Sequence, residues 1–164
     1  MIGEWESRAR QYADHPLVID TNLLLLLIVG ATDPVAISKF ARTDDFNRGD
    51  FDTVVKIAEF FAVRRGLLTT PHVLAEVSNF LRRGAKFRST LAAFVVTRTE
   101  EHCEPAKHLV QDRLFPAIGL TDVGLLAMAC RQHCVLTTDG GLAAAIYSGG
   151  GAVINYNHIR FEKI

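Results

Sequence analysis

The chain has 164 residues, of which 49% are hydrophobic and 22% are charged. This composition predicts one compact, soluble domain over residues 1–164 with a substantial buried core. Eighteen basic and eighteen acidic side chains cancel, so no overall electric field draws the chain towards nucleic acid or anionic membranes, and any such binding must use a local patch.

The apolar run LLLLLIVGA, residues 23–31, is followed by Asp33 and Pro34. Because a membrane-spanning helix needs about 20 apolar residues, roughly twice the length of this run, we expect a buried helix and no membrane partner. The charged N-terminus has no long apolar core, which makes a cytoplasmic location the expectation. The three cysteines are read as reduced thiols, since their number is odd and no export signal is evident.

The first half of the chain alternates strand-like and helical segments. LVID, residues 17–20, predicts a buried strand that the leucine-rich helix follows, and the polar stretch 32–50 predicts a loop. Apolar residues recur at helical spacing over 50–65. GLLTT, residues 66–70, predicts a second strand, after which Thr70 caps a helix with Pro71 in its first turn.

The second half continues the alternation. Two helices are expected at 86–98 and 105–116, and Thr121 begins another. The remaining expected elements are a strand at 134–138, a short helix at 141–147, a turn at 149–151 and a final strand at 152–156. Strands that alternate with helices predict an α/β domain whose mainly parallel sheet is covered on both faces.

Four acidic residues adjoin these segments: Asp20, Glu76, Asp122 and Asp139. Ligands of open α/β sheets bind beyond the carboxyl ends of the strands, and the predicted topology brings all four acids to that edge. Clustered carboxylates repel one another and bind hard cations such as Mg²⁺ or Mn²⁺.

Each acid has a structural alternative of its own. Asp122 is also a favourable first-turn acid, Asp20 and Asp139 are typical turn formers, and Glu76 is typical of a solvated helix. The predicted position of all four acids at one edge of the sheet favours a shared site over a separate structural role for each acid.

The order of VIDTN, a helical glutamate, LTDVGLLAMA and VLTTD resembles the PIN-domain nucleases, which include the VapC-type toxins of toxin–antitoxin pairs. The resemblance runs over about residues 17–156. It implies a three-layer α/β/α fold, one or two bound Mg²⁺ or Mn²⁺ ions, and cleavage of RNA phosphodiester bonds. It also implies an antitoxin or a second copy of the chain as partners, and the sequence leaves both open.

By position, the resemblance assigns catalytic and metal-binding roles to Asp20, Glu76, Asp122 and Asp139. Asn22 and Thr137 correspond to polar residues that support the first and last of these acids. One departure is Gly141, because many family members carry a further acid at that position. A second metal is therefore expected to be weakly held or absent until the substrate supplies oxygen ligands.

The basic segment RRGAKFR follows the helix that carries Glu76. Its cations are candidate contacts to RNA phosphates, with complementation of a helix end as the structural alternative. The residues concerned are Arg82, Arg83, Lys86 and Arg88.

Three function classes remain open from the sequence. The first is a metal-dependent endoribonuclease, and the second is a non-catalytic PIN-like protein that binds RNA or acts as a scaffold. The third is phosphoryl transfer through Asp20, which lacks the acid expected two residues later. A zinc site at Cys130, His133 and Cys134 lacks an evident fourth ligand. Helical surface within 23–61 is a candidate antitoxin site, and complete burial of the leucine-rich helix is the alternative.

Overall fold

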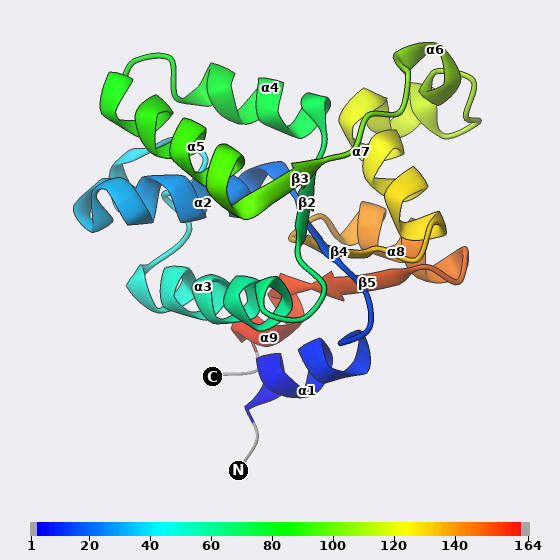
Figure 1. Ribbon diagram of the computed structural model, residues 1–164, viewed down its shortest axis with the longest axis horizontal. Helices are drawn as coiled ribbons and strands as arrows, with labels where there is room; N and C mark the ends of the chain where they lie inside the picture. Colours follow the sequence, from blue (N-terminus) through cyan, green and yellow to red (C-terminus); the bar gives the residue numbers. More distant parts are fainter. Residues whose placement is uncertain (1–2, 162–164) are drawn as a thin grey trace.

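Five short strands pair in parallel into one sheet, in the order β3-β2-β1-β4-β5. The computed structural model describes residues 3–161. Helices flank both faces of the sheet, which gives three layers (Figure 1). The strands are β1 Leu17–Ile19, β2 Leu67–Thr69, β3 Thr99–Glu101, β4 Cys134–Thr137 and β5 Ala152–Asn155.

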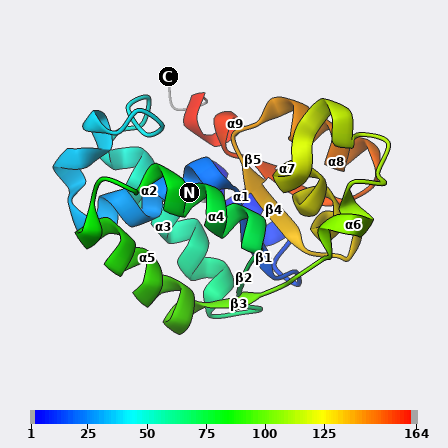
Figure 2. The ribbon, with the colours of Figure 1, turned by 90° about the horizontal axis from the view of Figure 1, so that it is seen from above.

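The connections between the parallel strands are helical. α3 packs against β1 and β2 with α1 beside it, α7 packs against β4 and β5, and α8 packs against β5 (Figure 2). The helices are α1 Glu4–Gln11, α2 Thr21–Thr32, the 3₁₀ helix η1 Pro34–Lys39, α3 Arg48–Ala62, α4 Pro71–Phe80, α5 Ala85–Arg98, α6 Ala106–Leu109, α7 Phe115–Cys130, α8 Gly140–Ser148 and α9 Tyr156–Phe161.

The predicted α/β class and the mainly parallel sheet are confirmed. α4 begins as its sequence predicts, since Thr70 accepts a hydrogen bond from the Val73 amide and Pro71 occupies the first turn. Within α7, Gly119 has φ 82° and ψ 177°, a conformation open to glycine but costly for other residues. Gly119 therefore separates the beginning of α7 from a regular segment that starts near the predicted Thr121.

Three expectations about the elements were wrong. The single helix expected at 105–116 is the four-residue α6 followed by a turn and the beginning of α7. The loop expected at 32–50 contains η1, where the Asp33 side chain accepts a hydrogen bond from the Val35 amide. β3 was not expected, because Thr99, Glu100 and Glu101 carry no apolar alternation. This strand lies at the edge of the sheet, where its polar side chains can stay in water.

The leucine-rich α2 is enclosed by its neighbours. Every residue from Leu23 to Gly30 is buried, and the helix contacts η1, α3, α4, α5 and β4. The alternative of a helix buried on nearly all sides is thus the correct one, and the leucines of α2 do not form an apolar docking face. Among residues 3–161, no helix is long and apolar enough to cross a membrane.

Gly30 makes this close packing possible. A Cβ atom at residue 30 would lie 2.3 Å from Cδ2 of Phe51 on α3, well inside van der Waals contact. The Phe51 ring therefore occupies the space that any larger residue would need.

We expect Gly30→Ala to lower the free energy of unfolding by about 1 to 3 kcal/mol, because the Phe51 ring must move out of a packed interface. Urea denaturation followed by circular dichroism measures this change. Gly149→Ala is the control, since its Cβ would meet Ala145 O at 3.5 Å and Ile146 O at 3.6 Å, which are ordinary contact distances. Equal stability of the Gly30→Ala variant and the wild type would show that the α2–α3 contact is loose.

Candidate metal and phosphodiester site

Asp20 follows β1 and caps α2, and both of its carboxylate oxygens are held. Oδ1 accepts from the Thr21 amide at 2.6 Å, and Oδ2 accepts from Thr137 Oγ1 at 2.6 Å. The side chain is almost fully buried. Burial raises the pKa of Asp20, the hydrogen bonds from Thr137 and Thr21 lower it, and the charges of Asp139 and Glu76 raise it.

Thr137 connects the first and last of the predicted acids. It ends β4, which pairs directly with β1, and its hydroxyl donates to Asp20 while accepting from the Asp139 amide at 2.9 Å. Asp139 Oδ1 in turn caps α8 by accepting from the Leu142 amide at 2.9 Å. Thr137 therefore fixes the Asp20 carboxylate and the Asp139 backbone relative to each other.

Glu76 lies in the second turn of α4 and is fixed by two threonines. Oε2 accepts from Thr21 Oγ1 at 3.0 Å, and Oε1 accepts from Thr121 Oγ1 at 2.6 Å. These bonds join α4 to the first turn of α2 and to the middle of α7. Neither hydroxyl was predicted as a site residue, although Thr21 and Thr121 adjoin two of the predicted acids in the sequence.

Asp122 is half-buried at the start of the regular part of α7. Its pKa is raised to about 7, first by loss of solvent and then by the negative charges of Asp20, Asp139 and Glu76. Since each of the other three acids raises the pKa of Asp122, the fold brings all four predicted carboxylates into one electrostatic neighbourhood.

No basic side chain among residues 3–161 forms an ion pair with these four carboxylates. The donors supplied to them are hydroxyls and amides, which leave the negative charge in place. An uncompensated set of carboxylate oxygens matches the ligand preference of Mg²⁺ or Mn²⁺.

The carboxylates share an electrostatic field without converging on one point. Within the described part of the chain, no three His, Cys, Asp or Glu side chains form a group that could hold a metal ion as they stand. Mg²⁺ usually keeps several waters and binds through one or two carboxylates. The arrangement therefore fits a cation with few direct protein ligands better than a closed protein cage.

The other predicted residues are placed as follows. Asn22 is partly buried in the first turn of α2, and within residues 3–161 the structure gives its side chain no hydrogen-bond partner. Gly141 is exposed in the first turn of α8. A Cβ atom at this position would lie 3.2 Å from Asp139 Oδ1. An acid at that position would thus lie beside Asp139, and the glycine leaves this side of the site uncharged.

Two of the four predicted phosphate contacts have partners in the protein. Lys86 Nζ lies 3.6 Å from Asp33 Oδ2, and Arg88 donates to the Ser78 carbonyl at 3.1 Å. Arg82 and Arg83 are exposed in the turn after α4 and line a hollow of about 540 Å³ together with Lys39. Arg82 is six residues beyond Glu76 in the sequence and lies two residues past the end of α4.

Comparison of the chain with protein-family models, with curated proteins and with solved structures finds no match.

We expect Asp122→Asn to stabilise the metal-free protein at about pH 8 by about 1 to 2 kcal/mol, a value reduced for solvent screening of a half-buried group. The fold favours the neutral form of the Asp122 carboxyl. The stability that Asp122 contributes is therefore complete below its ordinary pKa of 3.8 and is lost as the pH rises through about 7. The gain should therefore shrink towards about pH 4. Urea denaturation in EDTA measures it.

Asp44→Asn is the control for this experiment, because Asp44 is an exposed acid remote in sequence from the four carboxylates. A gain in stability that is the same at about pH 4 and pH 8 would mean that ionisation of Asp122 near the other carboxylates does not destabilise the fold.

Proposed function

We propose that this chain is a metal-dependent endoribonuclease that hydrolyses RNA phosphodiester bonds, with Asp20, Glu76, Asp122 and Asp139 as its catalytic centre. The observation that carries the proposal is the hydrogen-bonded linkage of the acids at the carboxyl end of the sheet, where Thr137 connects Asp20 with Asp139 and Glu76 is bound by Thr21 and Thr121. The raised pKa of Asp122, to which the other three acids contribute, supports it. The resemblance to PIN-domain nucleases supplies the choice of RNA, and it is also the sole basis for a role as the toxin of a toxin–antitoxin pair.

Some carboxylate oxygens of the site accept hydrogen bonds from the protein, and others do not. Both oxygens of Asp20 and of Glu76 accept hydrogen bonds from the protein, and Asp139 Oδ1 caps α8. The ion would be held by Asp139, whose Oδ2 accepts no hydrogen bond within residues 3–161, and by Asp20, whose oxygens keep lone pairs beyond the two that Thr21 and Thr137 use. When bound, Mg²⁺ or Mn²⁺ would acidify a water and neutralise charge on the phosphate.

Asp122 is the side chain that we assign to the attacking water. Within residues 3–161 the structure gives its carboxylate no hydrogen bond, and loss of solvent raises its pKa towards neutrality, which suits a proton acceptor. The water oxygen forms a bond to phosphorus, its proton passes to Asp122, and the bond to the leaving ribose oxygen breaks. Solvent then protonates that oxygen.

Glu76 has a positioning role in this proposal. Its two oxygens are engaged by Thr21 and Thr121, the residues that directly follow Asp20 and directly precede Asp122. The carboxylate therefore sets the spacing between these two acids and adds negative charge for the cation.

We expect purified protein to cleave a mixed RNA pool with Mg²⁺ or Mn²⁺, and to leave it intact with EDTA. Asp20→Asn and Asp122→Asn should each lower the rate at least about 100-fold, because the first removes a metal ligand and the second the proton acceptor. Gel analysis of end-labelled RNA measures the rate, and a DNA pool of the same sequences tests the choice of RNA.

Asp44→Asn, prepared identically, is the control for carry-over of cellular ribonucleases. Metal-dependent cleavage that survives in both Asp20→Asn and Asp122→Asn would place the activity elsewhere or in a contaminant.

A second candidate function is non-catalytic RNA binding. The specific observations in its favour are the glycine at position 141 and the absence, within residues 3–161, of a ready three-ligand metal group. RNA binding that is the same with EDTA and with Mg²⁺, and that yields no products, would favour this function over hydrolysis.

The predicted basic contacts can be tested by the salt dependence of RNA binding. If Arg82 and Arg83 each contact one phosphate, the variant Arg82→Gln with Arg83→Gln should reduce the slope of log affinity against log salt by about 1.4, at about 0.7 for each contact to a single strand. Lys56→Gln with Lys107→Gln removes the same charge from exposed positions. Equal slopes for the two double variants would show that the effect is one of net charge alone.

A further inference from the structure

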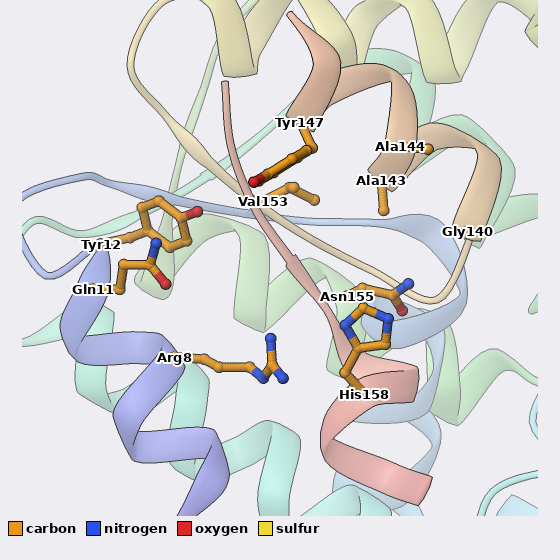
Figure 3. A pocket seen from close by; sticks show the side chains of 10 residues that line it. All are labelled: Arg8, Gln11, Tyr12, Gly140, Ala143, Ala144, Tyr147, Val153, Asn155 and His158. Atoms are coloured by element: carbon orange, nitrogen blue, oxygen red, sulfur yellow. The ribbon is translucent and has the colours of Figure 1, made fainter. Parts of the chain in front are cut away.

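A hollow of about 410 Å³ lies between α1, α8, β5 and the beginning of α9 (Figure 3). Its volume falls in the range of sites that bind small molecules or single nucleotides. Val153 forms part of its floor, and Gly140, Ala143 and Ala144 form the wall on α8. The small side chains of this wall are what leave the space open.

Polar and aromatic groups converge on the hollow from separate elements. Arg8 of α1 pairs through Nε with Glu4 Oε1 at 2.8 Å, and its guanidinium extends towards Asn155 and His158 (Figure 3). The rings of Tyr12 and Tyr147 lie on the opposite side of the hollow. Burial raises the pKa of the Tyr12 hydroxyl, the Cys134 charge raises it further, and a hydrogen bond with the Val153 backbone lowers it. Tyr147 and Arg8 have smaller effects, which raise and lower this pKa respectively. Tyr12 and Arg8 thus face the same space.

Tyr147 offers an aromatic face that the protein leaves uncovered. It is 76% exposed, whereas the Tyr12 ring packs edge-on against His15 with centroids 5.8 Å apart. Proteins bind single-stranded nucleic acid by stacking bases on such rings and by placing cations near the phosphates. The hollow provides both, in Tyr147 and Arg8.

The hollow is joined to the acidic site by the turn between β4 and α8. Gly140 lines the hollow and directly follows Asp139. Asn157 donates its side-chain amide to the Thr138 carbonyl at 2.8 Å and its backbone amide to Asn155 Oδ1 at 3.0 Å. The hollow therefore begins at the residue that follows Asp139.

We propose that this hollow binds one nucleotide of single-stranded RNA, next to the phosphate that is cleaved, with its base against Tyr147 and its phosphate towards Arg8. The proposal rests on the proposed function for its substrate. It also accounts for how a neutral chain with an acidic edge holds a polyanion, since the cation and the aromatic ring lie beside the carboxylates and not among them.

The test measures binding of a fluorescein-labelled, mixed-sequence 2′-O-methyl RNA in EDTA by fluorescence anisotropy, so that no cleavage is needed. Tyr147→Ala, which removes the stacking face, and Ala144→Leu, which fills the space, should each weaken binding about 5- to 10-fold. Val63→Ala and Ala92→Leu are the matched controls at exposed positions, and both should bind like the wild type. Circular dichroism verifies that each variant is folded.

Cleavage assays on the same variants separate this inference from the proposed function. If RNA is cleaved, Tyr147→Ala should raise KM and leave kcat nearly unchanged. Loss of affinity in Tyr147→Ala and Ala144→Leu, in a protein that cleaves nothing, would support the nucleotide site while removing the nuclease. Cleavage with wild-type affinity in both variants would overturn the nucleotide site and leave the nuclease intact. Equal weakening in the matched controls would also overturn it.

Discussion

The arrangement of the acidic edge depends on a series of short hydrogen bonds around the buried carboxylate of Asp20. Thr137 donates to Asp20, which accepts from the amide of Thr21, and the Thr21 hydroxyl donates to Glu76. Glu76 completes the series by accepting from Thr121. The series connects β4, β1, α2, α4 and α7, which are far apart in the sequence and meet at the carboxyl end of the sheet.

A charged group such as Asp20 is costly to bury unless its oxygens are hydrogen-bonded. Two donors offset part of this cost, and burial still raises the pKa of Asp20. The donors do not cancel the charge, and repulsion within the acidic set remains. The apolar scaffold stabilises the protein in spite of it, through the enclosed α2 and the fully buried β1 and β4. The apolar core therefore supplies the stability, and the acidic edge carries the candidate chemistry. Repulsion among the carboxylates remains at this edge, and a bound cation would relieve it.

Among residues 3–161, positive charge lies around this edge, and no basic side chain pairs with the four carboxylates at its centre. Arg82 and Arg83 lie beyond α4, and Arg8 lies across the turn that follows β4. This separation has a physical rationale, because an arginine among the four carboxylates would neutralise them and compete with a metal ion. In the proposed function, a polyanionic substrate would contact cations at its flanks while one phosphate meets the acidic centre.

Local sequence patterns determined the α/β class, the parallel sheet, the buried α2 and the capped beginning of α4, because apolar periodicity and Thr-Pro capping act over a few residues. They also identified Asp20, Glu76, Asp122 and Asp139 as acids at one edge. They missed β3, since Thr99 to Glu101 pair at a polar edge with no apolar alternation, and they merged α6 with the beginning of α7. Only the tertiary structure decided that Thr21 and Thr121 hold Glu76, that the pKa of Asp122 is raised, and that α1 and α8 leave a hollow beside Asp139. These properties arise from contacts between distant segments, and no local pattern specifies the distances on which they depend.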